Sequence, residues 1–205
     1  MKRVHLILGM LNGIYLLSFG LRFGLQRNFE FLIYVGVVLT TLIWIGLSLK
    51  RVDYALSTLI GLSVWGLMHM AGGGIVVGQG RLYDVMLLRW STTLPILRYD
   101  QVVHMWGFGS CVLFCYDLLK GQLADARRFP FSLGLVLVMA GLGLGAFNEI
   151  VEFGVTCAVP EAGVGGYLNT ALDLCANLVG ALLALLFLKI KFKISSLRWQ
   201  SQPSL

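Results

Sequence analysis

The feature that most constrains this chain is a series of six apolar stretches, each long enough to cross a lipid bilayer as a helix. A bilayer core of about 30 Å needs about 20 apolar residues in α-helical conformation. The stretches are continuous rather than alternating, and open sheet edges cannot be satisfied in lipid, so strands are disfavoured. The sequence therefore predicts an all-α fold, a polytopic transmembrane helix bundle forming one integral membrane domain over 1–205, with spans at about 4–21, 30–49, 54–78, 101–119, 131–156 and 169–188.

Composition supports the same class of protein. Hydrophobic residues make up 58% of the chain and charged residues 13%, whereas a soluble domain averages about 45–50% and about 25%. This excludes a water-soluble enzyme, a disordered protein and a free nucleic-acid binder. The net charge of +6 comes from Lys and Arg at the ends of the apolar stretches, so no nucleic-acid partner is expected.

The distribution of positive charge predicts the orientation. With six spans, both termini and the 50–53 and 120–130 connections share one side of the membrane. That side carries eleven basic residues, and the other side carries only Arg22, Arg27, Arg81, Arg89 and Arg98. The eleven are Lys2, Arg3, Lys50, Arg51, Lys120, Arg127, Arg128, Lys189, Lys191, Lys193 and Arg198. Because positive charge accumulates inside, both termini are expected in the cytoplasm.

Two segments leave alternatives open. The N-terminus also resembles a signal peptide, with a weak cleavage site at Ser18-Phe19-Gly20. The apolar stretch continues through Leu21 and Phe23, which favours a retained helix; its loss would leave five spans. The long connection at about 79–100 is itself rather apolar and is expected to form an outer interfacial helix or re-entrant flap, or else a loop packed on the bundle.

The polar residues inside the spans are the main pointer to function, because a charge at mid-membrane costs at least about 2.5–3.5 kcal/mol. Four helices of alternating direction carry such residues at the same, outer depth. They are His69 in the third span, Asp100 and His104 at the fourth, Asn148, Glu149 and Glu152 in the fifth, and Asn169, Thr170, Asp173 and Asn177 in the sixth.

Their spacing predicts a shared pocket. Asp100 and His104 lie four residues apart and so share a helix face, as do Asp173 and Asn177. Small residues continue these faces, which lets the helices approach closely and points the faces into the bundle. The polar residues are therefore expected to converge in an interior pocket open to the outside, beneath the 79–100 segment.

This residue set suits a divalent metal. His69, His104, Glu152 and Asp173 are predicted ligands for zinc, manganese or magnesium, and no compact metal motif is present. Glu149 would act as the general base or acid, and Asp100 would orient His104. Arg98 would hold an anionic headgroup, and Tyr99, Asn148 and Asn177 would contact substrate. Structural alternatives remain for several of them: a hydrogen-bonded core role for His69, a helix cap for Asp100, a boundary position for Glu152 and a helix lock for Asn177.

The same residues carry a resemblance to a known family. In sequence order they are His69 with Gly72-Gly73, Arg98-Tyr99-Asp100 with His104, Asn148-Glu149 with Glu152-Phe153, and Tyr167, Thr170, Asp173 and Asn177. Over about residues 60–185 the chain resembles the YjdF-like family of bacterial inner-membrane proteins. More distantly it is similar to VanZ-like teicoplanin-resistance proteins, through Asp100, His104, Glu149, Asp173, Asn177 and Gly180. The resemblance implies a small multi-pass protein of the bacterial inner (cytoplasmic) membrane with a polar cluster, but no particular substrate.

The leading hypothesis is a metal-assisted hydrolase or transferase that acts on a membrane lipid or a lipid-linked envelope substrate. A proton- or ion-coupled transporter is the first alternative, although the polar residues stop in the outer half of the spans. A non-catalytic membrane scaffold, in which the polar cluster only locks the helices, is the second.

Overall fold

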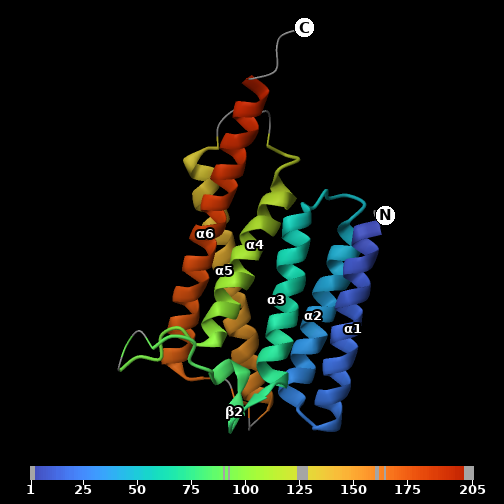
Figure 1. The fold of residues 1–205 in the computed structure, drawn as a ribbon, viewed down its shortest axis with the longest axis vertical. Coiled ribbons are helices and arrows are strands. Elements are labelled where there is room, and N and C mark those ends of the chain that lie inside the picture. Colours follow the sequence, from blue (N-terminus) through green and yellow to red (C-terminus); the bar gives the residue numbers. More distant parts are fainter. Residues whose placement is uncertain are drawn as a thin grey trace.

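The computed structural model describes residues 3–89, 91, 93–123, 129–159, 162–163 and 165–200, with the helical backbone alone for 195–200. Within these residues the chain forms an up-and-down bundle of long α-helices (Figure 1). The helices are α1 (Arg3–Leu25), α2 (Phe29–Ser48), α3 (Leu56–Gly74), α4 (Tyr99–Leu119), α5 (Phe131–Ala158) and α6 (Tyr167–Gln200). Of the charges used to predict orientation, Lys2, Arg127, Arg128 and the side chain of Arg198 lie outside the described residues.

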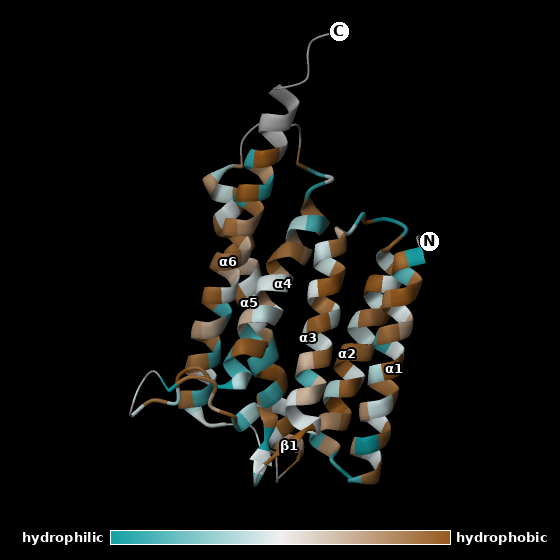
Figure 2. Cartoon of the chain, in the orientation of Figure 1, coloured by the Kyte–Doolittle hydropathy of each residue, from teal (hydrophilic) through white to brown (hydrophobic). Residues whose placement is uncertain are grey.

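The outer surface of the bundle is that of a membrane protein. The helices α1, α2, α4, α5 and α6 are long and apolar enough to cross a membrane. Many of their exposed residues are large and apolar, and Figure 2 shows hydrophobic colouring along much of the helices. Helix α3 has 19 residues but is not in that set, because Ser, Thr, His and Gly lower its hydropathy. The predicted all-α membrane bundle is thus confirmed, with five of the six predicted spans meeting this measure.

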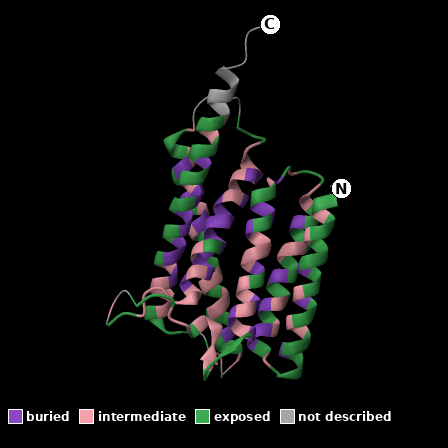
Figure 3. Cartoon of the chain, in the orientation of Figure 1, coloured by how far each residue is buried: buried purple, intermediate pink, exposed green. Residues whose placement is uncertain are grey.

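Close packing of α4 against α6 forms the centre of the bundle. A Cβ added at Gly109 of α4 would lie 2.9 Å from the carbonyl oxygen of Gly180, and one at Gly180 would overlap the carbonyl of Met105. Glycine at these two positions therefore lets the two backbones touch. Figure 3 shows the buried positions gathered on the inner faces of the helices, with exposed residues outside.

The segment between α3 and α4 differs from the sequence-based expectation. Helix α3 ends at Gly74 rather than near 78, because Ile75 is extended and the chain turns into a hairpin of β1 (Val76–Val77) and β2 (Gly80–Arg81). A 3-10 turn, η1 (Leu82–Asp84), follows. The chain then loops out and returns, with Leu87 N–H bonded to the Leu97 carbonyl at 3.0 Å. The described part of 79–100 thus contains no interfacial α-helix before α4 begins at Tyr99.

Both ends of the described chain lie at one end of the bundle, and the hairpin lies at the other (Figure 1). The beginning of α1 and the last turns of α6 share the first end, as six antiparallel helices require. Helix α6 continues beyond the predicted limit of 188 to Gln200. The hairpin end carries the first turns of α4 and α6 and the last turns of α3 and α5, where the intramembrane polar residues are found.

Candidate functional site

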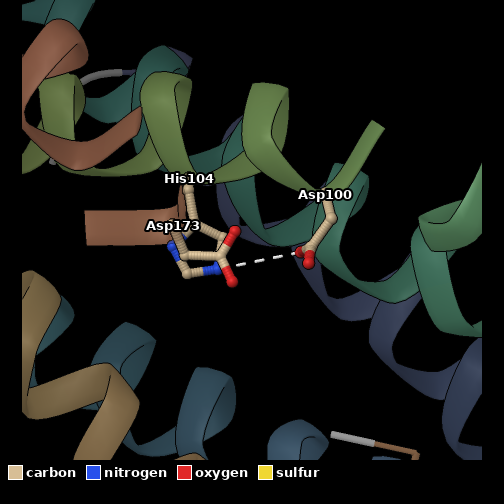
Figure 4. Close-up of side chains that lie close together, drawn as sticks. All are labelled: Asp100, His104 and Asp173. Atoms are coloured by element: carbon tan, nitrogen blue, oxygen red, sulfur yellow. Dashed lines mark ion pairs between the residues drawn. The ribbon is translucent and has the colours of Figure 1, made fainter. Parts of the chain in front are cut away.

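His104 is the centre of a polar cluster at the hairpin end of the bundle. Its side chain lies in the second turn of α4 and is only 6% exposed. Asp100, one turn earlier on the same helix, places Oδ1 at 3.7 Å from His104 Nε2. Figure 4 shows this pair, with Asp173 of α6 beside the imidazole ring. Ligand atoms of these three residues all lie within 4.8 Å of one another.

Helix α5 adds two carboxylates to the cluster. Glu149 places Oε1 at 3.8 Å from His104 Nδ1, and Glu152 places Oε1 at 4.0 Å from His104 Nε2. The two glutamates lie three residues apart, so one face of α5 presents both of them. Asn148 donates from Nδ2 to Glu152 Oε1 at 2.7 Å and holds that carboxylate in place.

Helix α6 orients the imidazole. Asn177 is completely buried, and its Oδ1 lies 3.1 Å from His104 Nδ1. Because the amide oxygen accepts, Nδ1 donates to it in this arrangement. Asn177 therefore takes the orienting position expected of Asp100, whereas Asp100 faces Nε2. An outer partner of this kind is typical of histidines that bind metals.

The donor atoms of the cluster fit a divalent cation. Two groups that could hold a metal, Asp100–His104–Asp173 and His104–Glu149–Glu152, share the imidazole. Glu149 Oε1 and Asp173 Oδ1 are buried and have no hydrogen-bond partner. Among the described residues, no Lys or Arg forms an ion pair with any of these four carboxylates. Buried carboxylates without partners are costly, so the cluster needs protons or a bound cation.

One further side chain holds two of the carboxylates together. Asn169, in the first turn of α6, donates from Nδ2 to Asp173 Oδ2 at 2.6 Å and to Asp100 Oδ2 at 3.4 Å. The sequence placed Asn169 at the correct depth but gave it no role. Its four-residue spacing from Asp173 is the signal that identifies the contact.

His69 does not join the two metal-ligand groups, contrary to its prediction as a ligand. Its Nδ1 lies 2.5 Å from the hydroxyl of Tyr83 in η1, which also donates to the His69 carbonyl at 3.1 Å. The rings of Tyr34 and Trp65 lie at 5.1 and 6.2 Å from the imidazole. Gly72 makes this contact possible, since a Cβ there would lie 2.6 Å from the Tyr83 ring.

Tyr83 is a neutral hydrogen-bonding group. Burial first, and then the negative charges of Asp100 and Glu152, raise the pKa of Tyr83 well above its ordinary value of 10.0. The phenol therefore keeps its proton at every physiological pH and fixes His69 in the wall of the site. The sequence analysis missed this residue because its position depends on the fold of the hairpin.

A small cavity of about 100 Å³ opens beside the cluster. Asp100, Glu152 and His69 line it, together with Arg98, whose Nε is buried without a partner. Tyr99 does not line it, because its hydroxyl donates to the Met68 carbonyl of α3 at 3.2 Å. Of the predicted substrate contacts, Arg98 therefore reaches the cavity, whereas Tyr99 joins two helices.

An ion pair closes one wall of the cavity. Arg81 of β2 places Nη1 at 3.1 and 3.2 Å from the two carboxylate oxygens of Glu30 at the start of α2. The backbone N–H of Gly163, between α5 and α6, donates to Glu30 Oε2 at 2.9 Å. Sequence reasoning assigned Arg81 only to membrane orientation and gave Glu30 no role. The signal for Glu30 that the sequence offered was an acidic residue at the very start of an apolar stretch.

The fold and the site together define a class: an all-α, membrane-type helix bundle with a buried His/carboxylate pocket at one end. The chain belongs to the family described as "Predicted membrane protein (DUF2238)", whose profile matches residues 5–193. This is the YjdF-like family that the motifs indicated. No curated protein and no solved structure matches the chain.

Proposed function

We propose that the pocket binds one divalent metal ion and that the protein is a metal-assisted hydrolase or transferase acting on a lipid or lipid-linked substrate of the cell envelope. One observation carries the proposal: four carboxylates from three helices surround a buried imidazole, and two of their buried oxygens have no hydrogen-bond partner. The bacterial inner membrane, with the pocket toward the outside, is the proposed location.

The donor set refines the choice of metal. His104 is the one nitrogen ligand in the two groups, since His69 is held by Tyr83. Carboxylate oxygens in the majority favour manganese or magnesium over zinc. His104 Nε2 faces Asp100 and Glu152, so we assign these two residues, His104 and Asp173 as ligands.

Glu149 remains available for proton transfer. Its Oε1 lies 3.8 Å from His104 Nδ1 and has no hydrogen-bond partner, and its ligand atom lies within 4.8 Å of that of Glu152. A bound divalent ion would lower the pKa of a coordinated water and stabilise negative charge on oxygen. Glu149 would take a proton from the attacking water while the water oxygen forms its bond to the acyl carbon or phosphorus. It would return that proton to the leaving oxygen as the bond to it breaks.

Arg98 is placed to bind an anionic part of the substrate. Arg98 lines the cavity, and its buried Nε has no hydrogen-bond partner. A guanidinium donates parallel hydrogen bonds to phosphate or carboxylate. Arg98 would thus hold a headgroup beside the four carboxylates, which by themselves would repel it.

Metal content tests the proposal directly. Protein purified in detergent is analysed by elemental mass spectrometry, as wild type and as His104→Ala, Asp173→Asn and Asp53→Asn. Asp53 is an exposed carboxylate at the opposite end of the bundle and is the matched control. We expect stoichiometric manganese or magnesium in the wild type and the control, and its loss in the other two variants. Folded wild type that takes up neither ion, even after incubation with Mn²⁺, would overturn the proposal.

The transporter alternative has less support in the structure. Toward the other end of the bundle, buried polar side chains of the described chain form separate pairs, such as Asn12 with Ser63 at 2.9 Å and Thr58 with Asp117 at 2.6 Å. Between the cluster and these pairs, α4 and α6 present apolar and small residues such as Phe108 and Ala181. A relay of hydrogen bonds across the bundle is therefore not built into the described residues.

A further inference from the structure

An apolar groove lies on the side of the bundle where α2 faces α5, with α3 and α4 beneath it. Its volume is about 200 Å³, and its walls are almost entirely apolar. Four of the wall residues are 38 to 61% exposed, so the groove opens sideways toward lipid. These four are Val37, Trp44, Leu144 and Phe147.

The groove adjoins the polar cluster at one residue. Asn148 lines the groove and also donates to Glu152 Oε1 at 2.7 Å. Two aromatic residues of the groove wall form a second connection. Trp65 lies 6.2 Å from the ring of His69, and Phe108 lies 5.6 Å from the ring of His104. The groove and the pocket thus share a wall.

Two larger apolar grooves exist elsewhere, but neither reaches the cluster. One lies between α1, α2 and α3, and the other between α3, α4 and α6. No residue that lines either of them belongs to the His/carboxylate cluster or is hydrogen-bonded to it in the described structure. Volume alone therefore does not single out the α2–α5 groove, whereas contact with the site does.

The direction of the groove matches the orientation of a lipid. From Asn148 and Val151, next to Glu152, its lining continues past the middle of the bundle to Trp44 and Phe114, in the later turns of α2 and α4. Residues 144–151 of α5 alone cover about 10 Å at 1.5 Å per residue. A lipid of the nearer leaflet places its headgroup at the membrane boundary and its chain toward the midplane, as this groove would require.

We propose that the substrate is a membrane lipid whose hydrocarbon chain lies in the α2–α5 groove while its headgroup enters the pocket past Asn148. The role of the headgroup rests on the function proposed above, but binding of the hydrocarbon chain in the groove is testable by itself. The inference specifies the substrate class: a molecule that enters sideways from the bilayer, with an anionic group close to the chain.

Photolabelling tests the position of the chain. Purified protein in nanodiscs receives phosphatidylglycerol with a diazirine on its acyl chain, in EDTA, and the labelled peptides are identified by mass spectrometry. We expect labelling concentrated on residues 37–45 and 144–151, reduced by excess unlabelled phosphatidylglycerol. Leu144→Trp fills the groove and should lower this labelling by about tenfold. Leu135→Trp, at a lipid-exposed position of α5 outside the groove, should leave it unchanged.

The outcomes separate this inference from the metal site. Equal labelling in the two tryptophan variants, or labelling spread evenly over all lipid-facing helices, would overturn the groove assignment. Because EDTA is present, groove labelling in a protein that never binds metal would support the groove and reject only the metal site. A protein that binds metal but shows no groove labelling that unlabelled lipid reduces would support the metal site and reject only the groove. A thermal unfolding midpoint of Leu144→Trp in EDTA equal to that of the wild type shows that the variant has folded.

Discussion

The two ring nitrogens of His104 face different partners, and this difference sets the chemistry of the site. Nδ1 meets the amide oxygen of Asn177 at 3.1 Å, and Nε2 faces Asp100 and Glu152 at 3.7 and 4.0 Å. The imidazole is therefore oriented through Nδ1 by a neutral amide, while Nε2 is directed at carboxylates. Removing the neutral partner should weaken the site without removing any ligand.

Asn177→Ala should raise the dissociation constant for Mn²⁺ about 10–100-fold, because the imidazole loses the group that fixes its orientation. The measurement is a Mn²⁺ titration followed by electron paramagnetic resonance. Asn12→Ala is the matched control, since Asn12 is another buried asparagine hydrogen-bonded far from the site. Equal weakening in both variants would show that the effect is a general loss of stability.

Glu152→Gln should change how stability responds to metal. With Mn²⁺ at about 100 times its dissociation constant, the wild type should gain about 2.7 kcal/mol. The variant should lose most of that gain because an amide is a poorer ligand. Without metal, the variant should be at least as stable as the wild type, since one of four clustered carboxylates is neutralised. Thermal unfolding in EDTA measures the stability without metal, and unfolding in Mn²⁺ measures the stabilisation by the ion. A variant that Mn²⁺ stabilises as much as the wild type would contradict the assignment of Glu152 as a ligand.

Site residues that helix geometry positions could be predicted from the sequence, whereas those that depend on the hairpin could not. Asp100 and His104 lie on one face by helix geometry, and the common depth of α5 and α6 brings Glu149, Glu152 and Asp173 to them. These relations follow from helix periodicity and span length alone. His69 shares the depth, but the hydroxyl of Tyr83 lies against its Nδ1. That contact depends on the conformation of a hairpin between helices, which hydropathy does not encode.

At the scale of elements, the contact of α4 with α6 determines the site geometry, because these helices carry His104 and Asp173. The contact depends on Gly180, where a Cβ would overlap the carbonyl of Met105. Displacement of α6 would therefore move a proposed ligand and the orienting asparagine together.

Gly180→Ala should lower the free energy of unfolding by about 1–3 kcal/mol through overpacking, and it should also weaken Mn²⁺ binding. Gly143→Ala should have neither effect, because an added Cβ at Gly143 has nothing within 4 Å. That control should even be stabilised by about 0.5–1 kcal/mol, since alanine is the better helix former. Thermal unfolding and Mn²⁺ titration of both variants check the prediction, and a destabilised Gly143→Ala would contradict it.

The hairpin is held over the pocket by Arg81 and Glu30, and their contact uses both carboxylate oxygens. Arg81→Lys should speed amide hydrogen exchange in residues 75–84, because an ammonium cannot reproduce the guanidinium geometry. Arg27→Lys, at an exposed arginine in the turn before α2, should leave exchange in 75–84 at the wild-type rate. Equal rates in all three proteins would show that the ion pair does not hold the hairpin.

Element boundaries show where hydropathy is a poor guide. The predicted third span ran to about 78, but α3 ends at Gly74, and the apolar residues Ile75, Val76 and Val77 leave the helix. Three successive glycines before them weaken helix propensity. The hairpin can therefore form while the sequence stays apolar. At the other end, α6 continues to Gln200 because its charged last turns still favour helix.

At the scale of the whole molecule, the continuous apolar stretches were enough to predict the all-α membrane bundle. The even number of antiparallel helices in the described structure places both chain ends opposite the hairpin (Figure 1). Which end faces the cytoplasm is a separate prediction that rests on the distribution of positive charge.

Cysteine labelling tests the orientation. In a variant whose four native cysteines are replaced by alanine, Val76→Cys at the exposed hairpin should react with a membrane-impermeant maleimide added to intact spheroplasts. Gly121→Cys, exposed beyond the far end of α4, should react only after the membrane is opened. The reverse pattern would place the pocket on the cytoplasmic side.

The four proposed metal ligands and Glu149 all come from α4, α5 and α6, whereas the facing walls of the groove and cavity include residues of α2 and α3. Helices α2 and α3 would therefore help to choose the molecule without holding any group that performs the reaction, whereas α4 and α5 would take part in both. Chimeras that exchange residues 1–75 between members of the family would change which lipids are accepted while leaving the reaction itself intact. New substrates within such a family could then arise from changes in the first three helices that leave the reacting groups untouched.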